Sequence, residues 1–140
     1  MTGPRTRSRR RSDRGSVVVE FALVVPLVVL VVLAVVQYGY HYWAMQTASA
    51  TAREAARRLI VGTDPVCTVT EAQARASGPA VGSTVPSVVY AYDNAGNTAE
   101  RGALVTVTVT IQSLDVGLVP LPSGGLVTQT ASNRVENVPI

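Results

Sequence analysis

The sequence Arg-Gly-Ser-Val-Val-Val-Glu-Phe-Ala-Leu-Val-Val-Pro occupies residues 14–26 and is followed by ten further apolar residues. Between Ser16 and Val36 the only charged side chain is Glu20. As a helix rising about 1.5 Å per residue, this stretch would cover about 31 Å. That length matches a hydrocarbon core of about 30 Å, so the stretch predicts a membrane-spanning helix. A carboxylate inside such a helix is costly, which indicates that Glu20 has a partner there.

Charge is distributed unevenly along the chain. Residues 1–15 carry six arginines against one acid, for a net charge of +5, whereas residues 16–140 carry six arginines against eight acids. Basic residues beside a membrane span favour the cytoplasmic side. We therefore expect a basic cytoplasmic leader at residues 1–15, a single pass through the plasma membrane, and a C-terminal domain outside. Contact with anionic lipid headgroups accounts for the arginines, so we expect no nucleic-acid partner.

An aromatic cluster at residues 38–43 follows the apolar stretch and contains the chain's one histidine, His41. Because Tyr and Trp favour the membrane–water interface, we expect residues 16–37 to span the bilayer and residues 38–43, His41 included, to form an interfacial belt. An alternative is a secretory signal peptide cleaved after the small-residue triplet at residues 48–50. The distance from the apolar run to that triplet, and the bulky aromatic residues between them, argue against this alternative.

The helix is expected to continue beyond the membrane, giving one helix over residues 16–61. Residues 44–61 are rich in helix formers and contain neither Gly nor Pro, while Gly62 and the following Asp64-Pro65 predict the end. Within the span, Pro26 removes a backbone hydrogen bond and predicts a bend or a loosened turn. Four alanines recur every four residues and form a small-residue ridge on one face: Ala44, Ala48, Ala52 and Ala56. The ridge could pack against another helix or against the chain's own C-terminal domain.

Residues 62–140 are expected to form an extracytoplasmic α+β domain. Two overlapping capping boxes, Thr68-x-x-Glu71 and Thr70-x-x-Gln73, predict a short second helix that ends at Gly78-Pro79. Alternating apolar and polar residues predict a strand over 105–112.

Weaker strands are expected over residues 85–92 and 126–135. The expected fold class is therefore α+β: a long, partly transmembrane N-terminal helix, a short second helix, and a small antiparallel sheet of about three strands packed on helix. Since a sheet of that size makes a marginal core, we expect it to need support from the long helix.

The sequence offers no constellation of residues for catalysis. With one His and one Cys, a thiolate zinc cluster cannot form and a nucleophile–base pair is nearly excluded. Phosphate loops, dinucleotide fingerprints and metal-binding His pairs are also missing from the sequence. We therefore expect no enzymatic activity, no cofactor, no metal and no small-molecule substrate. Cys67 is interpreted as a small half-buried apolar residue, with a cross-link to a second chain as the minor alternative.

Arg14-Gly15 followed by Ser16–Phe21 resembles the processing site of type IV pilin-like precursors, in which a basic leader ends in Gly and the fifth mature residue is Glu. The longer stretch Gly15–Leu27 is similar to TadE-like proteins of the Tad (Flp) pilus system. So is Ala52–Arg57, which has a glycine shortly after it. Asp13 departs from the pattern, because it interrupts the basic leader close to the cut.

The resemblance implies that a prepilin peptidase cuts between Gly15 and Ser16. Glu20 would then pair with the freed α-amine of a neighbouring subunit and fix the register of packed helices, with Phe21, Pro26 and the alanine ridge contributing to helix packing. The implied function is that of a minor pilin or pseudopilin, a structural subunit in the assembly of a Tad/Flp-type pilus or a related secretion apparatus.

The implied partners are the membrane, the prepilin peptidase, other pilin-like subunits and the inner-membrane pilus platform, with incorporation into an extracellular pilus. The alternative is a permanent single-pass membrane protein whose small external domain binds a partner.

Overall fold

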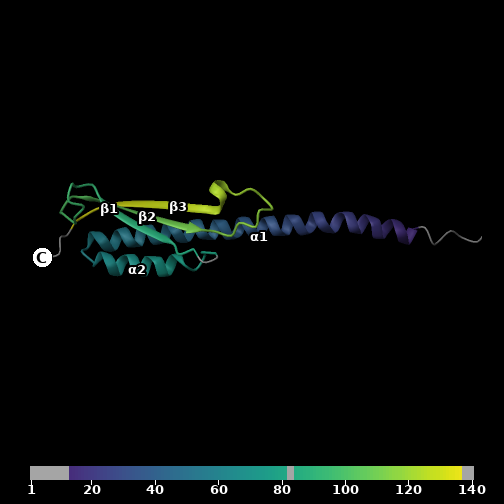
Figure 1. Cartoon of the computed structure of the whole chain (residues 1–140), viewed down its shortest axis with the longest axis horizontal. Coiled ribbons are helices and arrows are strands. Elements are labelled where there is room, and N and C mark those ends of the chain that lie inside the picture. The colour runs from purple at the N-terminus through teal and green to yellow at the C-terminus, as the bar shows by residue number, and fades with distance from the viewer. Residues whose placement is uncertain (1–12, 82–83, 137–140) are drawn as a thin grey trace, which may run out of the picture.

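The computed structural model describes residues 13–81 and 84–136. Figure 1 shows one long helix with all other elements gathered along its C-terminal half, while its N-terminal half extends alone. The order of elements is α1 (Asp13–Ile60), α2 (Pro65–Ala76), β1 (Ser87–Tyr92), β2 (Leu104–Gln112), η1 (Pro122–Gly125) and β3 (Leu126–Arg134). This arrangement confirms the expected α+β class with a long helix, a short helix and a three-stranded sheet.

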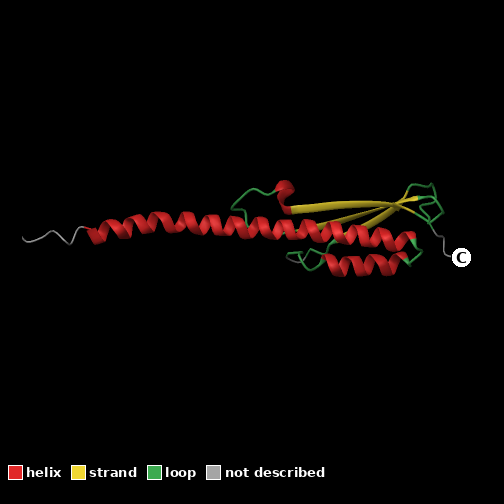
Figure 2. Cartoon of the chain, turned by 180° about the vertical axis from the view of Figure 1, so that it is seen from behind, coloured by secondary structure: helices red, strands yellow, loops and turns green. Residues whose placement is uncertain are grey.

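Helix α1 is a single helix of 48 residues. It begins three residues before the expected start and ends one residue before the expected end, at Ile60. At a rise of about 1.5 Å per residue its length is about 72 Å. The helix continues through Pro26, and Figure 2 shows its ribbon unbroken along its whole length.

The C-terminus of α1 is closed by Gly62, as the sequence predicts. Gly62 has a φ of 83°, in the left-handed region that glycine adopts without steric cost. Its N–H donates to the carbonyl of Leu59 (3.3 Å), and the N–H of Thr63 donates to the carbonyl of Arg58 (3.1 Å). These bonds satisfy carbonyls that the end of a helix leaves without partners.

The three strands form an antiparallel sheet in the order β1-β2-β3, with β2 in the middle. Along β2 every second residue is buried, as the alternation of the sequence predicts. Four of its residues are fully buried: Val105, Val107, Val109 and Ile111. The opposite face carries threonines, two of which bond across to β3: Thr106 to Ser132 (3.0 Å) and Thr110 to Thr128 (3.4 Å). One face of the sheet is therefore apolar and the other is rich in hydroxyl groups.

The apolar face of the sheet packs against the C-terminal half of α1, and α2 packs against α1 as well. All four alanines of the ridge have an exposed fraction of 0% and belong to the same core as the buried residues of β2. Because alanine has the smallest apolar side chain, the helix backbone can lie close to its neighbours. Of the two uses left open for the ridge, packing within the chain's own domain is the one the structure contains.

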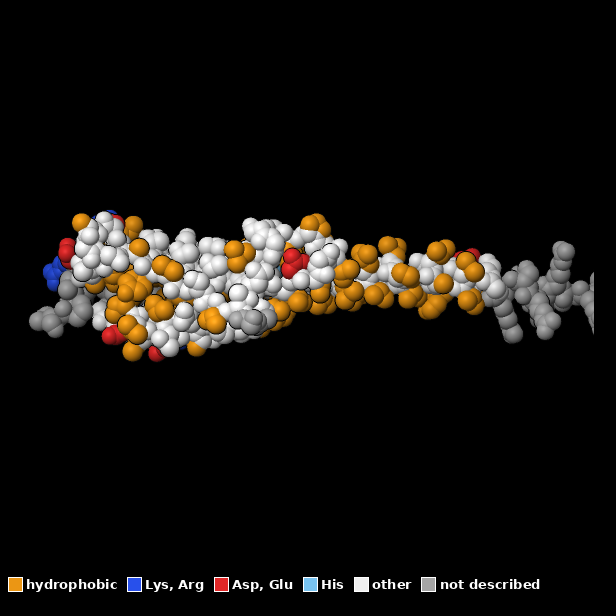
Figure 3. Space-filling model, in the orientation of Figure 1, with side chains coloured by type: hydrophobic (Ala, Val, Ile, Leu, Met, Phe, Trp, Pro, Cys, Tyr) orange, Lys and Arg blue, Asp and Glu red, His pale blue; other side chains and the backbone are white. Residues whose placement is uncertain are grey.

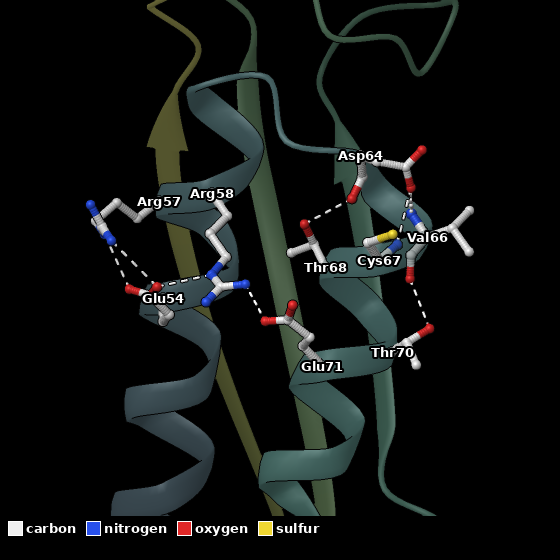
Figure 4. Close-up of polar contacts among 9 residues, drawn as sticks. All are labelled: Glu54, Arg57, Arg58, Asp64, Val66, Cys67, Thr68, Thr70 and Glu71. Atoms are coloured by element: carbon white, nitrogen blue, oxygen red, sulfur yellow. Dashed lines mark hydrogen bonds and ion pairs between the residues drawn. The ribbon is translucent and has the colours of Figure 1, made fainter.

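The start of α2 differs from the sequence prediction. The helix begins at Pro65, and Asp64 is its N-cap, with Oδ1 accepting the N–H of Val66 (2.7 Å). Both predicted capping boxes are wrong, because Thr68 and Thr70 lie inside the helix and donate to the backbone carbonyls of Asp64 and Val66 (Figure 4). A proline at the first helical position has its φ preset for the helix and lacks only an N–H that needs no partner there.

Candidate processing and assembly site

The N-terminal half of α1 is exposed on all sides. Its most apolar 18-residue window is 0% buried, and the helix is long and apolar enough to cross a membrane. Figure 3 shows this half as a narrow rod covered with hydrophobic side chains. A helix that is apolar all round is stable only inside a protein or a bilayer, and the described chain does not cover this one. The segment therefore has the properties of a membrane anchor.

Gly15 and Ser16 lie in the first turn of α1, which begins at Asp13. A Cβ added at Gly15 would meet no atom within 4 Å, so packing within the chain does not require glycine there. The first four N–H groups of a helix make no intrahelical bond, and glycine is about 1 kcal/mol worse than alanine in a helix. The backbone at residues 15–16 therefore unwinds at a lower free-energy cost than the interior of the helix.

Glu20 lies one turn after Ser16 on the same face of α1. The hydroxyl of Ser16 donates to Oε1 of Glu20 at 3.4 Å, and both residues are exposed. Around the carboxylate the surface is apolar, with Val19 60% and Phe21 69% exposed. The geometry presents a negative charge on an apolar surface, close to the residue that cleavage would make the N-terminus.

The residues predicted for helix packing fall into two separate groups. Phe21 and Pro26 lie on the exposed N-terminal half of α1, where no described side chain covers them. The alanine ridge lies on the C-terminal half and is buried against the domain. The structure therefore does not bring the two groups together.

An ion-pair cluster joins α1 to α2 (Figure 4). Arg58 Nε lies 2.9 Å from Oε1 of Glu54, the pair that the i,i+4 spacing predicts, and Arg57 Nε lies 3.1 Å from Oε2. Arg58 also binds Glu71 on α2. The hydrogen bond from Arg57, followed by that from Arg58, lowers the pKa of Glu54 to about 2. Bonding to Glu54 in turn raises the pKa of both arginines.

This cluster explains the stretch Ala52–Arg57 in structural terms. Ala52, Ala55 and Ala56 are buried in the core, while Glu54 and Arg57 lie on the outer side of the same turns. The segment therefore contributes alanines to the core and holds Arg58, which binds Glu71 on α2, through Glu54. It lies far along the helix from Glu20.

A buried polar contact between α1 and the end of the sheet does not follow from the sequence. Nε2 of Gln37 donates to the carbonyl of Val119 (3.0 Å) and to Oδ1 of Asp115 (3.3 Å), and Gln37 has an exposed fraction of 0%. Nδ1 of His41 lies 2.9 Å from the hydroxyl of Ser113, and His41 is 7% exposed. Both side chains belong to the face of α1 that continues into the alanine ridge.

The assignment of His41 to an exposed aromatic belt is therefore wrong. Its position, four residues after Gln37 and on the face of the ridge, is the signal that could have indicated burial. Three aromatic residues of the belt remain accessible: Tyr38 (45% exposed), Tyr42 (62%) and Trp43 (47%). In the described residues, no group of three or more His, Cys, Asp or Glu side chains could hold a metal ion. Cys67 is exposed, which corrects its interpretation as half-buried.

Residues 15–57 match a family model described as TadE-like protein. The match begins at the glycine of the predicted cleavage site, ends at Arg57 in the ion-pair cluster, and lies entirely within α1. It confirms the resemblance to TadE-like proteins over this part of the chain. Neither a curated protein nor a solved structure matches the chain.

Proposed function

We propose that this protein is a minor pilin-like (pseudopilin) subunit in the assembly of a Tad/Flp-type pilus or a related secretion apparatus. The exposed half of α1 holds the subunit in the plasma membrane until it packs against the helices of other pilin-like subunits. The observation that carries this proposal is Glu20, a carboxylate on an apolar helix surface whose described side-chain contact is the hydroxyl of Ser16. A plain anchor gains nothing from a charge there, since the charge opposes insertion.

In the proposed mechanism a prepilin peptidase removes the basic leader by cutting between Gly15 and Ser16 on the cytoplasmic side. Residues 1–12 of that leader lie outside the described residues, so the leader remains a prediction from the sequence. The position of Gly15 in the first helical turn supports the proposal, because only a short piece of helix must unwind for the cut.

Cleavage would leave a positive α-amine on Ser16. Glu20 of one subunit then pairs with the amine of its neighbour in a surrounding of low dielectric constant, where an ion pair is far stronger than in water. The pair neutralises both charges and fixes how far one helix is shifted along the next. The partners are thus the membrane, the prepilin peptidase, other pilin-like subunits and the inner-membrane pilus platform.

The excess of arginine before the span supports an N-terminus in the cytoplasm and an α+β domain outside, because basic residues favour the cytoplasmic side of a span. The domain packs along the C-terminal half of α1, so it would remain on the outer surface when the apolar half is built into a filament.

The test is the N-terminal residue of the full chain, measured by mass spectrometry on protein purified from membranes of a host with its native prepilin peptidase. We expect a chain that starts at Ser16. An intact leader would instead support a permanent single-pass anchor with an interaction domain, and a chain that starts at Thr51 would indicate a secreted protein and contradict both.

Two glycine substitutions sharpen this test. Gly15 and Gly39 both lie in α1 with no atom within 4 Å of an added Cβ, so alanine fits the helix equally well at either position. We expect Gly15→Ala to slow the cut, whereas Gly39→Ala leaves it unchanged. Equal processing of the two variants would contradict a peptidase that reads Gly15.

A further inference from the structure

The connection between β2 and η1, residues 113–121 (the β2–η1 loop), extends past the end of the sheet and along α1 towards its exposed half (Figures 1 and 2). Four hydrogen bonds attach this loop to α1, one of them the contact between His41 and Ser113 (2.9 Å) described above. Gln37 donates to Val119 (3.0 Å) and Asp115 (3.3 Å), and the hydroxyl of Tyr38 donates to the carbonyl of Pro120 (3.0 Å). The loop is therefore fixed to the helix immediately after the apolar stretch ends.

The tip of the loop carries two exposed apolar side chains, Val116 (52% exposed) and Leu118 (50%). Between them Gly117 has a φ of 69°, and its N–H donates to Oδ1 of Asp115 at 2.9 Å. The same carboxylate oxygen accepts from Gln37, so the turn and its attachment to α1 share one side chain. Turn tips in contact with water are usually polar, and this one is not.

The depth of the loop follows from the length of the span. A bilayer core of about 30 Å needs about 20 helical residues, and the segment Val17–Val36 supplies that number. The expected span of residues 16–37 therefore ends at Gln37, directly after Val36, which is 53% exposed. Because Gln37 is bonded to the loop, the tip lies at the surface of the bilayer whenever α1 spans it.

We propose that the β2–η1 loop is a second membrane contact, with Val116 and Leu118 inserted among the lipids of the outer leaflet beside α1. Lipid is the occupant because the bonds from Gln37 and Tyr38 fix this exposed apolar tip beside the end of the apolar stretch of α1. Asp115 and the polar atoms of Gln37 then lie at the level of the headgroups. Held at two points, the domain is restricted in how far it can tilt relative to the bilayer. This inference requires only that α1 crosses the bilayer; it does not require cleavage or a pilus.

The test uses the full chain with Cys67→Ser, because Cys67 is exposed and would itself be labelled. A single cysteine is introduced by Leu118→Cys and labelled with an environment-sensitive nitrobenzoxadiazole dye. The protein is then reconstituted in phosphatidylcholine vesicles with or without brominated acyl chains. We expect a blue-shifted emission that the brominated lipid quenches, and the same behaviour for Val116→Cys, which serves as an independent second site.

Two matched positions frame the result. Leu30→Cys, in the middle of the span and 47% exposed, should be quenched, whereas Val89→Cys, on β1 and 58% exposed, should be neither shifted nor quenched. Emission at residues 116 and 118 that matches Val89→Cys would overturn the proposal. A blue shift without quenching would mean that protein covers the loop, which also overturns it. An unquenched label at Leu30→Cys would show that α1 does not span the bilayer, and this would overturn the proposal. Cleavage at Gly15 is measured in a separate experiment.

Discussion

At the scale of single residues, the position of Glu20 makes a sharp prediction about assembly. If its carboxylate pairs with the amine of a neighbouring subunit, Glu20→Ala leaves one buried charge without a partner. Breaking a buried pair in this way costs about 3–5 kcal/mol, which corresponds to a loss of association of roughly a hundredfold or more. We expect the variant to enter the membrane normally but to disappear from isolated pili and from pull-downs of other pilin-like subunits.

The matched control for that variant is Val19→Ala. Val19 is 60% exposed on the same turn of α1 and carries no charge, so it tests the loss of apolar surface alone. Normal recovery of Glu20→Ala in purified pili would contradict the pairing, and equal loss of both variants would point to helix packing as the cause.

The proposed processing site is a prediction from the sequence alone, and its signal is local. Gly15, Ser16 and Glu20 are identified by their spacing within one helix. Gln37 could not be placed, because its partner Asp115 lies 78 residues further along the chain. His41 was misplaced for the same reason, since its burial depends on Ser113 at the end of a distant strand.

At the scale of elements, the close packing of α1 within the domain depends on small side chains. Ala48 is fully buried, so Ala48→Leu forces extra volume into a filled core and should destabilise the fold by about 1–3 kcal/mol. Ala50→Leu is the control, because Ala50 is exposed on the same helix and should change stability by less than about 0.5 kcal/mol. Thermal unfolding of the detergent-solubilised chain, followed by circular dichroism, measures both. Equal thermal unfolding midpoints for Ala48→Leu and Ala50→Leu would contradict the tight packing of the alanine ridge.

The stability of the domain should depend on pH through Glu54, which binds Arg58, the residue that contacts Glu71 on α2. The pKa of Glu54 in the folded protein is about 2, below the ordinary value of 4.5, because Arg57 and Arg58 bond its charged form. Its contribution to stability is therefore complete above pH 4.5 and is lost as the pH falls from 4.5 towards 2. We expect the difference in unfolding midpoint between wild type and Glu54→Gln to shrink over that interval.

The control for the pH dependence is Glu136→Gln, which removes an exposed acid outside the cluster. Its midpoint should follow that of the wild type at every pH. A difference between wild type and Glu54→Gln that stays constant down to pH 2 would show that the cluster does not stabilise the fold through the charge of Glu54.

An element is predicted well from the sequence when the residues that determine it are close together in the chain. The alternation along β2 requires only that one face of a strand is buried, so the sequence predicts its position to within a residue. The predicted N-cap of α2, Thr68, lies four residues after the observed N-cap, Asp64. The prediction assigns Asp64-Pro65 to the end of α1, whereas they are the N-cap and first residue of the next helix. The turn is so short that its residues end one helix and begin another.

At the scale of the whole molecule, the structure changes where the folded domain is expected to begin. The core includes six residues of α1: Ala44, Ala48, Ala52, Ala55, Ala56 and Leu59. A fragment of residues 62–140 lacks all of them and retains a three-stranded sheet with one short helix, which is marginal as a core. A fragment of residues 37–140 keeps the complete core together with Gln37 and its bonds to the β2–η1 loop.

We therefore expect the fragment of residues 37–140 to be soluble and to unfold cooperatively, and the fragment of residues 62–140 to remain largely unfolded. Dispersion of amide signals in NMR spectra of the two fragments distinguishes these outcomes. A well-dispersed spectrum for the shorter fragment would show that the sheet and α2 do not need α1 for their stability.

The continuity of α1 also has a mechanical meaning. One uninterrupted helix passes from the exposed apolar half into the core of the domain, and β3 runs lengthwise beside it (Figure 1). A force along the axis of the helix therefore acts on the contacts between helix and sheet in shear. In this direction the contacts must break together, whereas a force that peels the sheet from the helix would break them one by one. Because α1 is one continuous helix, a force applied at its membrane end is transmitted along the helix to the whole domain.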